Sequence, residues 1–187
     1  MGAKRDVMAM QPPGSSAPRV AVHATSVVLG AASAPFGGAV EGAVLLLGKA
    51  GAGKSDVALR LIAMGARLLA DDQTLLFAEG ERLFAEGISS LHGRIEIRGV
   101  GIVALKPAGP APVILAVMLN PDSAISRLPE PLRYTLPAPL EATEGPPLLH
   151  LSPFEAATPA KIAAAAAALS RGAFVAGLVS PSSGPFF

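Results

Sequence analysis

The chain has 187 residues, of which 51% are hydrophobic and 4% aromatic, with a formal net charge of +1 and no cysteine. This length suffices for one domain whose core consists mainly of small aliphatic side chains. The near-neutral charge gives no basis for binding nucleic acid or an anionic membrane, and the lack of cysteine excludes disulfides and thiolate metal sites. No apolar run approaches the roughly 20 residues of a membrane-spanning helix, and no signal peptide is recognisable. We therefore expect a soluble, cytoplasmic protein without nucleic-acid or membrane partners.

The chain begins with a segment rich in Pro, Gly, Ser and Ala. We expect residues 1–18 to form a disordered leader, residues 19–172 a single folded domain, and residues 173–187 a flexible tail. Beta-branched residues in 19–29 predict a strand or a strand pair. The small residues of 30–38 predict a loop.

The most informative stretch is glycine-rich and fits the phosphate-loop pattern G-x-x-x-x-G-K-[ST]. It consists of Gly48, Lys49, Ala50, Gly51, Ala52, Gly53, Lys54 and Ser55. An apolar run at 42–47 predicts a buried strand before it, and apolar residues at helical spacing predict a helix after it that has Gly65 at its C′ position. A chance match in a chain with 20 glycines is the alternative. The flanking strand and helix favour a nucleotide or polyphosphate site, with Lys54 on the β- and γ-phosphates and Ser55 on Mg²⁺.

A second apolar strand is predicted at 66–70, and it ends in Asp71 and Asp72. Proteins with a phosphate loop hold, at such a position, the carboxylate that faces Mg²⁺ and the γ-phosphate. Adjacent carboxylates elsewhere belong to a solvated turn or a helix cap. The preceding strand favours the functional role here.

The remaining predicted elements complete an α/β domain. A hairpin is predicted at 74–78 with 82–85, and an edge strand with a bulge at 94–103. Two further strands are predicted at 113–119 and 148–151. One extended segment is predicted at 132–136, among the proline-rich loops of 121–147. A final helix is predicted to run to about Gly172, with Thr158 as its N-cap and Pro159 at N1. The expected fold is a mixed sheet with flanking helices and the phosphate loop at the end of a central strand.

Three blocks of sequence in this order resemble the catalytic, C-terminal-type domain of HPr kinase/phosphorylase. They are residues 48–56, 67–72 and 96–102, and His23 lies upstream in a Val-His-Ala-Thr-Ser-Val segment like that of the family. A phosphate loop alone gives no information about the substrate, whereas three blocks with this spacing are much more specific. The resemblance implies a fold of the HPr kinase/PEP carboxykinase type. It also implies a short form that stands alone without the N-terminal domain of longer relatives.

The resemblance further implies an activity. Family members use ATP and Mg²⁺, or in some cases pyrophosphate, to phosphorylate a serine of HPr, a small phosphocarrier protein. Many also remove the phosphoryl group by phosphorolysis with inorganic phosphate. A role in carbon and phosphotransferase signalling and assembly as a homo-oligomer, a hexamer in the family, follow from the same resemblance.

Catalytic roles carry over from the family to individual residues. Asp72 would be the general base toward the serine and, when protonated, the acid in phosphorolysis. Lys54 would neutralise charge on the transferred group, and Asp71 would act through orientation or metal. His23 would set the protonation of Asp72; the alternative for His23 is a partly buried strand histidine.

Metal and phosphate roles carry over in the same way. Ser55 and Glu96 would bind Mg²⁺, and Arg98 would help to hold the phosphate that attacks in phosphorolysis. Without the resemblance, the segment containing Glu96 and Arg98 would be an edge strand with a solvated charged face.

Two departures from the family keep other functions open. Residues 30–38 lengthen the spacing between His23 and the phosphate loop, and residues 149–155 contain no arginine where the family has a catalytic one. One alternative is a small-molecule kinase, for which an arginine-rich lid is expected although 121–147 holds only Arg127 and Arg133. The other is a regulatory module that binds nucleotide without catalysis.

Overall fold

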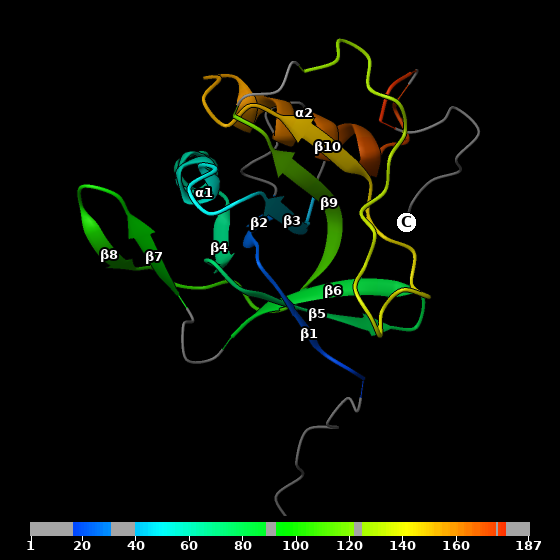
Figure 1. Cartoon of the computed structure of the whole chain (residues 1–187), viewed down its shortest axis with the longest axis horizontal. Coiled ribbons are helices and arrows are strands. Elements are labelled where there is room, and N and C mark those ends of the chain that lie inside the picture. Colours follow the sequence, from blue (N-terminus) through cyan, green and yellow to red (C-terminus); the bar gives the residue numbers. More distant parts are fainter. Residues whose placement is uncertain (1–16, 31–39, 89–92, 122–124, 175, 179–187) are drawn as a thin grey trace, which may run out of the picture.

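The computed structural model describes residues 17–30, 40–88, 93–121, 125–174 and 176–178, which form ten strands and two helices (Figure 1). The strands are β1 Val20–Val22, β2 Thr25–Leu29, β3 Gly42–Leu47, β4 Arg67–Ala70, β5 Thr74–Glu79, β6 Arg82–Gly87, β7 Arg94–Ile97, β8 Gly101–Ala104, β9 Ala111–Leu119 and β10 Leu148–Leu151. The helices are α1 Lys54–Ala63 and α2 Thr158–Ser170. In these ranges neither helix has the length and apolar character needed to cross a membrane.

A mixed sheet of eight strands forms the centre of the fold and confirms the predicted α/β class. Its order is β1-β5-β6-β9-β3-β2-β4, with β10 paired to β9. β3 and β10 are parallel to β9, whereas β2 is antiparallel to both β3 and β4. β9 is long and curved, so that its start pairs with β6 and its end with β10 (Figure 1). The strand before the glycine loop therefore lies inside the sheet, as predicted.

Every residue of β3 is buried, because the strand is covered on both faces. Successive residues of a strand point to opposite faces, so its side chains divide between two hydrophobic clusters. Val44 packs in one cluster with Leu61 of α1, and Leu45 packs in the other with Leu76 of β5. Burial of each leucine contributes about 1.5–3 kcal/mol, and the start of the glycine loop is firmly anchored as a result.

Glycines define both ends of α1. Gly53 is the N-cap with φ of 82°, and a Cβ there would lie 2.9 Å from the Cβ of Pro153. At the other end Gly65 has φ of 100°, and the Ala66 N–H donates to the Leu61 carbonyl at 3.0 Å. This bond belongs to a Schellman motif, which confirms the predicted C′ position of Gly65.

The segment 94–103 differs from the predicted edge strand. It forms a two-stranded hairpin, β7–β8, which is separate from the main sheet and projects beside α1 (Figure 1). Gly99 and Gly101 have φ of 82° and 120°, and the Val100 N–H donates to the Ile97 carbonyl. The glycines therefore reverse the chain instead of forming a bulge. The predicted 74–85 hairpin and the extended segment near Arg133 are confirmed.

The start of α2 also differs from the prediction. The N-cap is Ala157, and no side chain caps the helix. The hydroxyl of the buried Thr158 instead donates to the carbonyl of Ser152, so it ties the helix to the chain that follows β10. Beyond the helix, Phe174 and Leu178 pack against the core.

The predicted domain boundaries at 18 and 172 remain predictions. Residues 1–16 of the leader, 31–38 of the predicted loop, and 175 and 179–187 of the tail lie outside the described residues.

Candidate active site

The glycine loop opens onto a cleft of about 580 Å³. The cleft is lined by residues of several elements. They include all of the predicted catalytic residues and metal ligands: His23, Lys54, Ser55, Asp71, Asp72, Glu96 and Arg98. Of the glycine loop, Ala50, Gly51 and Gly53 line it as well, whereas Gly48, Lys49 and Ala52 do not. The fold thus gathers five separate segments of sequence around one space.

The backbone of the loop has the conformation that a phosphate cradle requires. Gly48, Gly51 and Gly53 have φ of 143°, 77° and 82°, and the Ala52 N–H donates to the Lys49 carbonyl at 3.0 Å. Only glycine adopts these angles without strain. Successive N–H groups in such a turn, followed by a helix N-terminus, form a site for an anion.

Lys54 lies in the first turn of α1 and is 7% exposed. Its Nζ donates to the carbonyls of Gly48 and Lys49 at 3.0 and 3.1 Å. Burial lowers the pKa of the Lys54 ammonium, and the nearby Asp72 and Asp71 carboxylates oppose that shift. The loop is therefore bridged by its own lysine.

His23, between β1 and β2, links this lysine to one of the carboxylates. Lys54 Nζ lies 3.0 Å from His23 Nε2, and His23 Nδ1 lies 3.2 Å from Asp72 Oδ1. An ammonium group has only donors, so Nε2 must accept and a neutral ring carries its proton on Nδ1. The Nδ1–H then donates to Asp72. The result is a continuous chain of contacts from Lys54 through His23 to Asp72.

Asp71 accepts hydrogen bonds from three separate parts of the chain. Thr25 Oγ1 and Ser55 Oγ each donate to Oδ1 at 2.9 Å. The backbone N–H of Glu96 donates to Oδ2 at 3.1 Å. The carboxylate therefore connects β2, α1 and the β7–β8 hairpin at the centre of the cleft.

Asp72 has different surroundings from its neighbour. It has φ of 68°, and the Gln73 N–H donates to the Asp71 carbonyl at 2.8 Å, which closes a three-residue turn around Asp72. This turn directs the two adjacent side chains to different partners. The Asp72 side chain is 69% exposed, and its carboxylate contacts the side chain of His23. One carboxylate is thus occupied by donors, and the other is open to the cleft.

The hairpin contributes Glu96 and Arg98. Both are exposed, and Arg98 forms no ion pair within the part of the chain that the structure describes. Ile95 and Ile97 of the same strand pack into or against the core cluster that contains Leu61 of α1. Buried isoleucines therefore hold the strand in place while its charged residues line the cleft.

The donor set at this point suits Mg²⁺. Mg²⁺ binds through one or two carboxylates, with waters and substrate phosphates in the remaining positions. The Ser55 hydroxyl and the Asp71 carboxylate are adjacent oxygens of this kind. No group of three or more His, Asp or Glu residues suited to a metal occurs among the described residues. Of the two predicted ligands, Ser55 contacts Asp71 through its hydroxyl, and Glu96 contacts Asp71 through its backbone N–H.

Sequence comparison finds a known family over part of the chain. Residues 38–108 match the family model described as the HPr serine kinase C-terminal domain. The HPr kinase/phosphorylase of Chlorobium phaeobacteroides (strain BS1) is 47% identical over 66 residues, which cover 35% of this chain and 20% of that protein. The enzyme of that name from Streptococcus salivarius is 46% identical over 61 residues, or 32% of this chain and 20% of the relative.

The fold agrees with this match. The structure of the HPr(Ser) kinase/phosphatase from Coxiella burnetii aligns with a TM-score of 0.61 and 23% identity, over 78% of this chain and 87% of that one. The chain is similar to the catalytic domain of HPr kinase/phosphorylase. The sequence matches span about a fifth of the length of these curated relatives.

The HPr kinase C-terminal match includes the glycine loop, the acidic pair and the β7–β8 hairpin, and ends before β9. His23 lies outside it, and so does the segment 149–155 that lacks an arginine. That segment reaches the cleft through Phe154, which is 70% exposed. An aromatic ring thus lines the cleft from the segment in which the HPr kinase family is expected to have an arginine.

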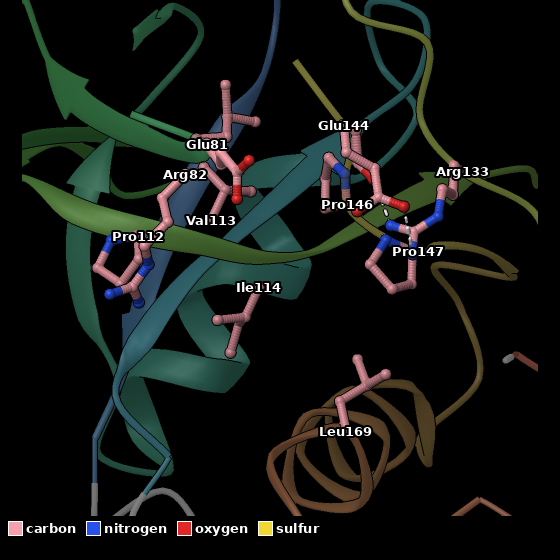
Figure 2. Close-up of a pocket in the computed structure, with 12 residues that line it drawn as sticks. Glu81, Arg82, Pro112, Val113, Ile114, Arg133, Glu144, Pro146, Pro147 and Leu169 are labelled. Carbon is pink, nitrogen blue, oxygen red and sulfur yellow. Dashed lines mark hydrogen bonds and ion pairs between the residues drawn. The ribbon is translucent and has the colours of Figure 1, made fainter. Parts of the chain in front are cut away.

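The arginines of the proline-rich segment do not reach the cleft. Arg133 lines a separate pocket of about 110 Å³ between β9 and α2 (Figure 2). Its guanidinium pairs with Glu144 at 2.8 Å and donates to the Gly145 carbonyl at 2.8 Å. Arg127 lies outside the cleft lining too. A small-molecule kinase is expected to have an arginine-rich lid over its site. The described part of this segment supplies no such lid.

Sequence reasoning missed Thr25, which is fully buried and bonded to Asp71. A signal was present, because Thr25 follows His23 by two residues. Within the predicted strand 19–29, residues at that spacing would point to the same side, although the structure places His23 in a bend between β1 and β2. Phe154 was missed as well, since an isolated aromatic in a turn carries no motif.

Proposed function

We propose that this chain binds Mg-ATP in the cleft and transfers the γ-phosphoryl group to a serine hydroxyl of an HPr-like carrier protein. One observation carries the proposal: Ser55 of the glycine loop donates to Asp71, and Lys54 is linked through His23 to Asp72, an adjacent carboxylate with different surroundings. Phosphoryl transfer needs mainly alignment and charge stabilisation, and this arrangement offers both.

Asp72 is proposed as the base that accepts the serine proton. Its carboxylate is exposed, so a hydroxyl of a second protein can reach it. His23 holds the carboxylate in place through its Nδ1–H, and Lys54 sets the tautomer of His23. In the reverse direction the protonated Asp72 would return the proton to the serine oxygen while inorganic phosphate attacks, and Arg98 would hold that phosphate.

Asp71 and Ser55 are proposed to hold Mg²⁺, with the carboxylate of Glu96 as a further ligand from the hairpin. The ion would neutralise charge that develops on the phosphates during transfer. Thr25 orients Asp71 through its hydrogen bond to Oδ1. Pyrophosphate is an alternative phosphoryl donor, because the glycine loop recognises phosphate groups.

The wider proposal follows the family. Residues 19–172 would form the catalytic domain of a cytoplasmic homo-oligomer, a hexamer by resemblance, that acts in carbon and phosphotransferase signalling. A second candidate is a nucleotide-binding module without catalysis, and the lack of arginine in 149–155 favours it.

The test is incubation of the protein with Mg-ATP and the HPr of its host, followed by mass spectrometry for phosphoserine. The controls are Asp72→Asn and an HPr whose acceptor serine is replaced by alanine. Phosphoserine formed by the unmodified pair alone supports the kinase. Binding of Mg-ATP without transfer would leave the non-catalytic module, and absence of binding would refute both candidates.

A further inference from the structure

We infer that Phe154 forms the nucleobase subsite of this cleft and stacks against the base of a bound nucleotide. The inference rests on the proposed function, since it assumes that the glycine loop holds the phosphates of that nucleotide. It assigns to the protein a preference for nucleotides over inorganic polyphosphates.

The exposure of Phe154 is the first observation. The ring is 70% exposed although it lines the cleft. The other exposed large hydrophobic residues in the described ranges are aliphatic: Val100, Ile102, Leu128 and Leu132. A large aromatic ring contributes most when it is covered. A flat apolar ligand in the cleft would provide that cover.

The second observation is the rigid support on both sides of Phe154. Arg60 of α1 donates to the carbonyls of Pro153 and Glu155, the latter at 3.0 Å, and pairs with Asp56 on the same helix at 2.8 Å. Both neighbours of the aromatic residue are therefore held by one guanidinium. A backbone fixed in this way loses little conformational freedom when a ligand stacks on the ring.

The segment that holds Phe154 also contacts the glycine loop. Pro153 is buried against Gly53, the residue at which the glycine loop joins α1. Leu59 also lines the cleft, and it lies four residues beyond Ser55, which is about one helical turn along the same face. The cleft thus continues from the phosphate end along α1 toward Phe154. A nucleotide has the same order of parts, with charged phosphates at one end and a flat base at the other.

Binding measurements with two ligands test the inference. Mg-ATP and Mg-tripolyphosphate share a chain of three phosphates, and only ATP has a base. Calorimetry would compare the unmodified protein with Phe154→Ala, Phe154→Trp and the control Leu132→Ala, an exposed residue outside the cleft lining. We expect Phe154→Ala to weaken ATP binding by about 10-fold, a typical loss for one stacked base. Its affinity for tripolyphosphate should stay within about 2-fold, because the phosphate contacts are unchanged. Phe154→Trp and Leu132→Ala should bind ATP like the unmodified protein.

Three results would overturn the inference while the proposed function stands. Phe154→Ala could leave ATP affinity unchanged. It could weaken both ligands equally, which would make the turn a support for the glycine loop. It could impair only the use of the acceptor, with a raised KM for HPr, which would make Phe154 a contact for that protein. Failure of the unmodified protein to bind either ligand would instead refute the proposed function and, with it, the subsite.

Discussion

Replacing Thr25 by valine isolates one hydrogen bond at the centre of the cleft. The side chain is 0% exposed, and its hydroxyl donates to Asp71 Oδ1 at 2.9 Å. Valine has a similar shape, so packing is retained while the donor is lost. A hydrogen bond to a charged group contributes about 1.5–3 kcal/mol. Asp71 keeps its donors from Ser55 and Glu96, so we expect a loss of about 1.5–2 kcal/mol in the free energy of unfolding.

Urea unfolding measures this loss. With a slope of about 2 kcal/mol per molar urea, the midpoint should fall by about 0.75–1 M. Thr25→Ser keeps the hydroxyl and removes one methyl group, so it should lose only about 0.8 kcal/mol. Thr135→Val, at an exposed position, should leave the midpoint unchanged. In activity assays Thr25→Val should raise the Mg²⁺ concentration needed for half-maximal transfer, because Asp71 is less firmly oriented.

Two outcomes would contradict this account of Thr25. If Thr25→Val is as stable as the unmodified protein, the hydrogen bond contributes nothing to folding. If Thr25→Ser loses as much as Thr25→Val, the methyl group and not the hydroxyl is what matters. An unchanged Mg²⁺ requirement would separate Asp71 from metal binding.

Four further predictions concern the groups that line the cleft. Asp72→Asn should reduce phosphoryl transfer by ~10²–10⁴-fold and still bind Mg-ATP, whereas Asp71→Asn should be milder; the opposite ranking in steady-state kinetics would reverse their roles. Lys54→Ala should weaken ATP binding while circular dichroism stays unchanged. Because burial lowers the pKa of Lys54, calorimetry at rising pH should show ATP affinity falling before an ordinary lysine would titrate, since only the protonated amine attracts phosphate. Arg98→Ala should reduce phosphorolysis by at least ~10-fold more than phosphorylation in initial-rate assays, whereas equal losses would leave the hairpin as a structural element with one metal ligand, Glu96.

The sequence predicted those parts of the fold that depend on local signals. Apolar runs and glycines with positive φ located β3, α1 and the C′ residue Gly65. The hairpin at 94–103 was mistaken for one strand, because a bulge and a turn both require such a glycine. The choice between a bulge and a turn depends on which strand pairs with this segment, and the neighbouring residues in the sequence do not determine that pairing.

The same limit applies to the site. The residues with motif spacing were predicted, but their partners were not. Thr25 meets Asp71 across 46 positions of sequence, and Arg60 reaches the carbonyl before Phe154 across 93. Such contacts follow from strand pairing and helix packing over long distances, which no pattern within a single segment specifies.

The chain of contacts from Lys54 through His23 to Asp72 gives the site an order in time. A bound phosphate that attracts the Lys54 ammonium group away from His23 would remove the hydrogen bond that Lys54 donates to Nε2. The imidazole could then exchange its tautomer, and its contact with Asp72 would change with it. Binding of a phosphate donor would thereby affect Asp72, the proposed base. An enzyme built in this way would bind its nucleotide first and accept its protein partner second.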